Sequence, residues 1–342
     1  MIRRIKHAST ATCTLPIYMG FLMTEPNSIS CTQLAETYNI SHDSVNRFLE
    51  REDYTPHDLY QEAIQHIDNN KLIVSIDDTV LDKPYSQHMD LVSYFWSGKH
   101  HRSVKGINLI TLYATDQNGQ NIPINFRIYD KSEGKTKNDY FMDMLSEVLS
   151  WGAKIQFITG DSWYSSTGNL KTIRKHGIRF MFGIDCNRKV SPEKGQWFQL
   201  RLLPDFHQGQ VVWLKDFGFV QLFKTQLKEQ QRFYIVHQDE DDLLSFEGFH
   251  ELHSSHWKIE QYHRVIKQVC HIEKFQVRRS KLILNHIFSA LMAYVEIQKN
   301  QFERIFENVY RWQKKLFRPM IKNFIDDFIL DKNHLLPQRI YK

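Results

Sequence analysis

Cysteine is scarce in this sequence. The four cysteines among its 342 residues are scattered without the paired spacing of a zinc site or a disulfide framework: Cys13, Cys31, Cys186 and Cys270. A reducing, cytoplasmic setting therefore fits best. Internal repeats and low-complexity segments are also absent. The composition, with 42% hydrophobic and 24% charged residues, is that of a globular protein and excludes global disorder.

Long hydrophobic runs are missing as well. Residues 1–23 place basic charge before an apolar stretch, but a threonine, a proline and a glycine interrupt it and no clear cleavage site follows. The most apolar later run, residues 282–297, contains an asparagine, a histidine and a glutamate, and it is too short and too polar to span a bilayer. We therefore expect neither export nor a membrane span, and we interpret residues 282–297 as a core helix.

Positive charge is concentrated in the C-terminal third. The net charge of the chain is +5, yet residues 257–342 carry 17 Lys and Arg against 8 Asp and Glu, whereas residues 1–256 carry 27 against 31. This distribution favours a polyanionic partner, because cations that neutralise phosphates release counterions. A solvated basic face on surface helices would have the same composition, so charge alone leaves both interpretations open.

Residues 29–52 have the pattern of a helix-turn-helix. A first helix over residues 32–38 and a tight turn would lead to a second helix with Ser41 as its N-cap. The outward face of the second helix would carry side chains that can contact base edges or phosphates: His42, Ser44, Asn46 and Arg47. Short amphipathic helix pairs also occur in bundles that bind no DNA, so the pattern favours DNA binding without requiring it.

Beyond residue 68 the period of the pattern changes. Strand-like segments are expected at residues 72–77, 107–115, 121–130, 155–161 and 179–185. Helices are expected at residues 137–151 and 166–176, between the third, fourth and fifth of these strands. This order predicts an α/β fold with a mixed sheet.

The rest of the chain divides in two, because the pattern is strand-rich up to residue 244 and helical afterwards. We therefore predict five regions: a helical DNA-binding domain (1–68), the first part of an α/β core (69–185), a β-rich insertion (186–244), the helical completion of the core (245–300) and a basic helical tail (301–342).

Carboxylates follow two of the predicted strands. Asp77 follows the apolar residues 71–76, and Asp161 follows Gly160 at the end of a later strand. If these strands are neighbours, the two charges meet at one end of the sheet and repel each other unless a cation lies between them. The pair suggests a divalent metal site made of hard oxygen ligands, although either aspartate alone would more simply cap a turn.

A third acidic candidate lies in the segment HSSHWKIEQYHRVIKQ. On a helix, Glu260, Arg264 and Lys267 share one face, and His253 and His256 precede them on much the same side. Chemistry on phosphate needs such a set, because the acid holds metal and the cations hold the DNA backbone. A solvated ion-pair face is the simpler alternative, and the two histidines with the glutamate could instead bind zinc.

With these residues in view, the sequence resembles the DDE transposases of bacterial insertion sequences, which are cut-and-paste enzymes with an RNase H-like core. The resemblance rests on SIDDTVLDK around Asp77, ITGDSWYSS around Asp161 and WKIEQYHRVIK around Glu260. It covers roughly residues 70–300. The order of strands and helices expected above is similar to that of the RNase H-like core.

One large group of these enzymes carries a β-strand insertion domain and a Tyr-Arg-Glu-Lys signature. The long gap between Asp161 and Glu260 resembles that insertion. Glu260 and Lys267 match the signature in spacing, but His253 and His256 stand where Tyr and Arg are expected. This departure bears on the contacts to phosphate more than on the fold.

The resemblance implies a fold and a mechanism. The fold would be an RNase H-like mixed-sheet core, interrupted by a β-rich insertion after its fifth strand and flanked by helical regions. Asp77, Asp161 and Glu260 would hold two Mg²⁺ or Mn²⁺ ions, roughly 3.5 to 4 Å apart, for in-line attack on phosphorus. Water would cleave the element end, and the freed 3′ hydroxyl would then attack target DNA.

The resemblance also implies partners and a location. The partners would be double-stranded DNA, namely the terminal inverted repeats of the element and its target, and a second copy of the chain that forms a homodimer on DNA. The location would be the bacterial cytoplasm. A metal-dependent nuclease of the same fold, and a domesticated transposase that acts as a DNA-binding regulator, are the alternative functions.

Four further residues carry weaker predictions. Successive residues of a strand face opposite sides, so only one of Asp77 and Asp78 can point into the site, and the Asp-x-Thr pattern selects Asp77. Lys83 lies in a following basic loop that either contacts DNA or is merely solvated. Trp197 and Trp213 lie in the region where relatives stack an aromatic side chain on a flipped base, although tryptophan among strands belongs more often to the core.

Overall fold

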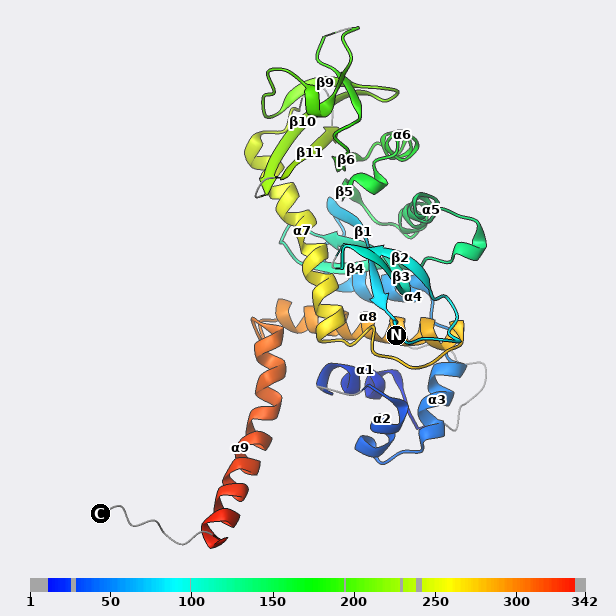
Figure 1. Ribbon diagram of the computed structural model, residues 1–342, viewed down its shortest axis with the longest axis vertical. Coiled ribbons are helices and arrows are strands. Elements are labelled where there is room, and N and C mark those ends of the chain that lie inside the picture. The colour runs from blue at the N-terminus through cyan, green and yellow to red at the C-terminus, as the bar shows by residue number, and fades with distance from the viewer. Residues whose placement is uncertain are drawn as a thin grey trace, which may run out of the picture.

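The computed structural model describes residues 12–25, 29–98, 100–193, 195–227, 230–237 and 242–335. Residues 1–11, which bear on the expectation about export, and residues 336–342 of the expected tail lie outside the described residues. Within the described part, one continuous mixed sheet runs through the molecule and helices pack on both of its faces, as Figure 1 shows. No helix among these residues is both long and apolar enough to cross a membrane.

The helices and strands have the following bounds. The helices are α1 (Leu15–Thr24), α2 (Cys31–Tyr38), α3 (His42–Arg51), α4 (Pro56–Ala63), α5 (Lys137–Ser150), α6 (Thr167–Lys175), α7 (Phe246–Gln268), α8 (Ser280–Phe302) and α9 (Val309–Leu335). The strands are β1 (Leu72–Asp82), β2 (Ser93–Ser97), β3 (Arg102–Thr115), β4 (Asn121–Ile128), β5 (Ile155–Gly160), β6 (Arg179–Ile184), β7 (Lys189–Ser191), β8 (Phe198–Gln199), β9 (Gln210–Leu214), β10 (Gly218–Leu227) and β11 (Gln230–His237).

The core of the sheet has the order β4-β3-β1-β5-β6. β3 pairs antiparallel with both β4 and β1, whereas β5 pairs parallel with both β1 and β6. This is the mixed sheet of an RNase H-like fold, and it confirms the predicted fold class. The parallel connections run through α5 and α6, as parallel neighbours require.

Two details of the core differ from the prediction. β1 continues to Asp82, so Asp77 lies in the middle of a strand and not at its end; pairing with β3 along the whole of β1 supports this extension. The short strand β2 was not predicted, and it pairs only with β3 at the edge of the sheet. Six strands, β1 to β6, therefore precede residue 186, where the predicted insertion follows five.

The strands of residues 186–244 extend the core sheet. β11 pairs antiparallel with β6, and the order continues through β10, β9, β7 and β8. From this end of the sheet, α7 runs along the core to α8, as Figure 1 shows. A single helix therefore contacts both the insertion and the strand that carries Asp77.

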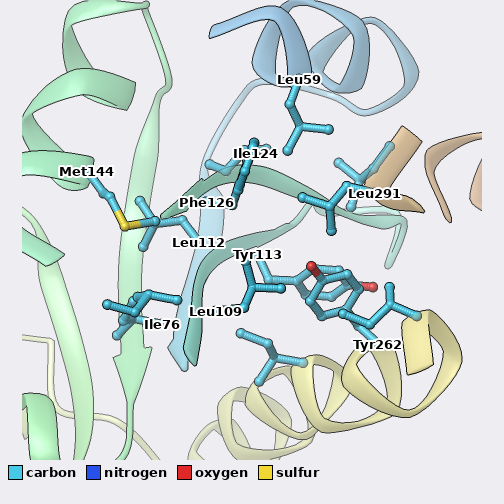
Figure 2. Packing of buried hydrophobic residues seen from close by; sticks show 14 of the residues in the cluster. Leu59, Ile76, Leu109, Leu112, Tyr113, Ile124, Phe126, Met144, Tyr262 and Leu291 are labelled. Atoms are coloured by element: carbon cyan, nitrogen blue, oxygen red, sulfur yellow. The ribbon is translucent and has the colours of Figure 1, made fainter. Parts of the chain in front are cut away.

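Neighbouring residues of β3 pack against different helical layers. The ring of Tyr113 stacks on Tyr262 of α7, with 4.8 Å between the ring centroids, and its hydroxyl lies 2.6 Å from the hydroxyl of Tyr294 in α8. Figure 2 shows this aromatic contact, with Leu112 and Met144 of α5 away from it. Because successive side chains of β3 point to opposite faces of the sheet, one face packs against α7 and α8 and the other packs against α5.

The N-terminal helices dock on α8, which is buried along most of its length and confirms the interpretation of residues 282–297 as a core helix. The side-chain amide of Asn285 donates to the carbonyl oxygens of Leu49 and Glu52, both at 2.7 Å. Asn285 therefore holds the end of α3, and the buried His286 lies 2.8 Å from the hydroxyl of Tyr18 in α1.

The helix-turn-helix pattern corresponds to α2 and α3. Ser30 and Ser41 cap the two helices, and Asn39 in the turn has a left-handed backbone conformation with φ of 52°. The expectation that Ser44 faces outward is wrong. Ser44 is buried, and its hydroxyl accepts a hydrogen bond from the backbone N–H of Cys13 at 2.9 Å. The chain segment before α1 covers this position, which two-helix periodicity could not show.

Gly160 sets the spacing of β1, β5 and β6. A Cβ atom at Gly160 would lie 2.6 Å from Cε1 of Phe182 and 2.7 Å from Cγ2 of Ile76. We expect Gly160→Ala to lower the free energy of unfolding by about 1–3 kcal/mol, the usual cost of overpacking, as measured by urea denaturation. Gly168→Ala in α6, where a Cβ meets nothing within 4 Å, is the control and should not destabilise the protein. Equal stability of the two variants would contradict this account.

Candidate active site

Asp77 of β1 faces α7. One potential ligand atom each from Asp77, Glu260 and His263 lies within 4.8 Å of the other two, and this is the cluster among the described residues that could hold a metal ion. Glu260 is exposed, whereas His263 lies beneath it and is buried. Sequence reasoning missed His263. Its spacing of three residues from Glu260, nearly one helical turn, was the available signal.

Asp161 lies beside this cluster at the end of β5. Ile76 and Gly160 are paired in the parallel ladder, so the residues that follow them lie next to each other. The carboxylate of Asp161 accepts a hydrogen bond from the backbone N–H of Trp163 at 2.9 Å. Asp161 is not part of the tight cluster, yet it is close enough for its charge to act on Asp77.

The carboxylates strongly affect one another. Burial raises the pKa of Asp77 well above its usual value, and the charges of Asp78, Asp161 and Glu260 raise it further. Desolvation, followed by the charge of Asp78, raises the pKa of Asp161 to about 6. A site with three carboxylates and an imidazole, in which negative charge is unfavourable, fits a divalent cation both in charge and in donor atoms.

Asp78 faces the other side of the sheet. Its carboxylate accepts hydrogen bonds from Asn108 at 2.6 Å, Lys137 at 2.7 Å and Tyr164 at 2.9 Å. These three donors occupy Asp78 and tie β1 to the start of α5. Of the two adjacent aspartates, Asp77 is therefore the one that lies with Glu260 and His263.

The comparison with protein families agrees with this geometry. A family model described as the transposase DDE domain matches residues 68–295, two thirds of the chain. The chain belongs to the DDE transposase domain family. This family normally uses divalent metal.

Other comparisons add little to this assignment of the DDE transposase domain. No curated protein matched the chain. Among solved structures, the chain is similar to an Argonaute from Marinitoga piezophila, solved in complex with 5′ OH guide RNA and target DNA, at 10% identity and with a TM-score of 0.23. That match covers 68% of this chain and 33% of the Argonaute chain, so this DDE transposase chain spans about a third of it.

The two histidines that depart from the Tyr-Arg-Glu-Lys signature contact the sheet of this DDE transposase domain. His253 Nε2 lies 3.0 Å from the hydroxyl of Tyr234 in β11, and His256 Nδ1 lies 3.2 Å from the hydroxyl of Thr159 in β5. Desolvation lowers the pKa of His256 to about 4, so it is neutral at pH 7. Neither histidine belongs to the metal-compatible cluster, so the structure does not assemble the zinc site considered above.

Of the cations expected to contact DNA near the site, Lys83 and Lys267 bind backbone carbonyl oxygens and Arg264 is exposed. Lys83 is buried, and its Nζ donates to the carbonyl oxygens of Glu273 and Phe275, both at 2.6 Å. The alternative of a solvated loop does not fit this burial, because the chain after α7 folds over Lys83, and contact of Lys83 with DNA stays a prediction. Lys267 Nζ donates to the carbonyl oxygen of Val80 at 2.6 Å, whereas Arg264 is exposed.

The two tryptophans of the insertion are both partly exposed. Trp197 is 44% exposed and Trp213 is 43% exposed, so neither is a core residue. Trp213 contacts Phe219 edge to face, with 4.7 Å between the ring centroids, beside a cavity of about 660 Å³ that Arg174 also lines. An aromatic pair next to a cation is a surface on which a base could stack.

The raised pKa of Asp161 predicts a pH dependence of stability. Between about pH 4 and pH 6 the unfolded aspartate has lost its proton while the folded one still holds it, so the stability of the metal-free protein falls as pH rises. Asp161→Asn keeps an N-cap acceptor and removes this loss. At pH 7 in EDTA we expect Asp161→Asn to melt at a higher temperature than the unmodified protein. Between pH 4 and 6 its melting temperature should change less with pH than that of the unmodified protein.

The matched control for this prediction is Asp185→Asn, which replaces an exposed aspartate outside the site. Its melting temperatures should follow those of the unmodified protein over the same pH range. A profile of Asp161→Asn as steep as that of the control would contradict the assignment of the raised pKa.

Proposed function

We propose that this chain is the transposase of a bacterial insertion sequence, which cleaves DNA at the element ends and joins them to target DNA. The proximity of Asp161 and Glu260 to Asp77 in an RNase H-like core supports the proposal, together with membership of the DDE transposase domain family. The substrates are the terminal inverted repeats and the target DNA. The enzyme acts as a homodimer on DNA in the cytoplasm.

The three acids would hold two Mg²⁺ or Mn²⁺ ions, which supply activation of the nucleophile and stabilisation of the leaving oxygen. The protein contributes position: β1 and β5 fix Asp77 and Asp161 side by side, and α7 brings Glu260 to them. Arg264 is exposed four residues after Glu260 on α7, where it can contact a DNA phosphate. Lys267 instead anchors α7 to β1, so its contribution is to position Glu260.

Binding of the element ends would use the N-terminal helices. α3 presents the side chains of His42, Asn46 and Arg47 away from its buried face. Near the other end of the chain, α9 extends away from the core, as Figure 1 shows, and exposes Lys314 and Lys315. These basic surfaces suit the phosphate backbone of double-stranded DNA.

One observation favours a second candidate function, a catalytically impaired transposase that regulates DNA. His256 is neutral and bonded to Thr159, at the position where related enzymes carry an arginine. One cation that would hold phosphate at the site is therefore absent. A protein that binds element ends but does not cleave them would fit this second function.

The decisive experiment is cleavage of DNA that carries the element ends, with Mg²⁺, by the intact protein and four single variants. We expect Asp77→Ala, Asp161→Ala and Glu260→Ala to lose cleavage by at least about a thousandfold while they keep DNA binding, because metal ligands act as a unit. Asp78→Asn, whose side chain faces α5, should retain cleavage. An intact protein that binds the ends without cutting them would favour the regulator instead.

Arg47 tests the DNA-binding role of α3. We expect Arg47→Ala to weaken binding to element ends by about 1–3 kcal/mol if the guanidinium reads a base edge. Arg47→Lys is the matched variant, because it keeps the charge and removes the bidentate hydrogen bonds. Mobility-shift titrations at several salt concentrations would measure both, and unchanged affinity of Arg47→Ala would remove α3 from the interface.

A further inference from the structure

We propose that His263 is a nitrogen ligand of the catalytic cation and that it makes this site prefer Mn²⁺ over Mg²⁺. The proposal rests on the proposed function, since it concerns the same metal site. It adds an imidazole to a set of ligands that the sequence resemblance describes as three carboxylates.

The distance between His263 and Asp77 suits two ligands of one ion. Nδ1 of His263 lies 3.6 Å from Oδ2 of Asp77, which is too long for a hydrogen bond. Two ligand atoms that each lie 2.0–2.2 Å from a shared cation are separated by about 3.0 to 3.6 Å at angles between square and trigonal. Glu260 completes the cluster within 4.8 Å, one helical turn before His263.

A purely structural histidine would be expected to hydrogen-bond through its ring nitrogens. The Nε2 of His263 is buried without a hydrogen-bond partner among the described residues, as is that of His286. His263 differs in its other nitrogen, because Nδ1 faces the carboxylate of Asp77 at 3.6 Å in a side chain that is 7% exposed. The ring is held by packing, with its centroid 5.2 Å from that of Tyr262. The neighbouring His253 and His256 behave as structural histidines, since each is bonded to a hydroxyl group of the sheet.

The ligand set determines the preferred ion. Mg²⁺ favours oxygen ligands in a near-ideal octahedron and gives up its water reluctantly. First-row transition ions bind imidazole more readily, so one nitrogen ligand shifts the preference toward them. Mn²⁺ accepts carboxylates as well as imidazole, and it is the ion of this class that suits a site with two or three carboxylates.

The test uses Mn²⁺ alone, without DNA. Pulsed electron paramagnetic resonance of the Mn²⁺-loaded full-length protein should show the ¹⁴N coupling of a directly bound imidazole, and His263→Gln should abolish it. Calorimetry should show a loss of at least about tenfold in Mn²⁺ affinity for His263→Gln, with Mg²⁺ affinity changed by less than about threefold. His256→Gln, on the same helix, is the matched control and should keep the coupling and the Mn²⁺ affinity.

Two results would overturn the proposal: no ¹⁴N coupling in the Mn²⁺-loaded unmodified protein, or a coupling that persists in His263→Gln. If His263→Gln does not fold, ¹⁵N-histidine labelling of the unmodified protein still decides whether an imidazole binds the ion. The two measurements distinguish a failure of this proposal from a failure of the proposed function. A ¹⁴N coupling in a protein that cuts no DNA would support His263 as a metal ligand and contradict the proposed transposase activity. Mg²⁺-dependent cleavage without a ¹⁴N coupling would support the transposase activity and contradict the role of His263 as a ligand.

Discussion

The parallel pairing of β1 with β5 is the constraint on which the site depends. It places Ile76 level with Gly160, and thereby Asp77 next to Asp161. Desolvation first, and then the charge of the neighbouring Asp78, raises the pKa of both carboxylates, and the charge of Asp161 adds to the shift of Asp77. The sheet holds them together through backbone hydrogen bonds and through the close packing that Gly160 permits. The core thus holds the carboxylates of Asp77 and Asp161 close together, and a bound cation would offset their negative charge.

α7 carries Glu260 and is fixed along its length. His253 contacts β11, His256 contacts β5, Tyr262 stacks on β3 and Lys267 binds the backbone of β1. Glu260 lies in the middle of these contacts. The two histidines that stand in place of Tyr and Arg of the related signature are therefore part of the attachment of the helix, whereas Arg264 on the same helix is exposed.

The side chains of the adjacent residues Asp77 and Asp78 point to opposite faces of the sheet, because side chains alternate along β1. Asp77 and Ser75 face α7, and the hydroxyl of Ser75 joins Thr159 and His256 in one line of contacts. Asp78 faces α5, where the ammonium of Lys137 lies against it. The hydrogen bonds of Asp78 to Asn108, Lys137 and Tyr164 occupy its carboxylate on the side of the sheet away from Glu260 and His263.

The sequence by itself determined the fold class and most of the order of the elements, because strand and helix periodicity is local. The local motifs around Asp77, Asp161 and Glu260 also selected these residues as the candidate acids. Only the tertiary structure decided where β1 ends, since its last residues are held by β3. It also decided which polar side chains are buried: Ser44, Lys83 and His263 lie inward because segments distant in sequence pack against them. Local periodicity shows which face of an element is apolar, but burial of a polar group depends on partners that only the folded chain brings to it.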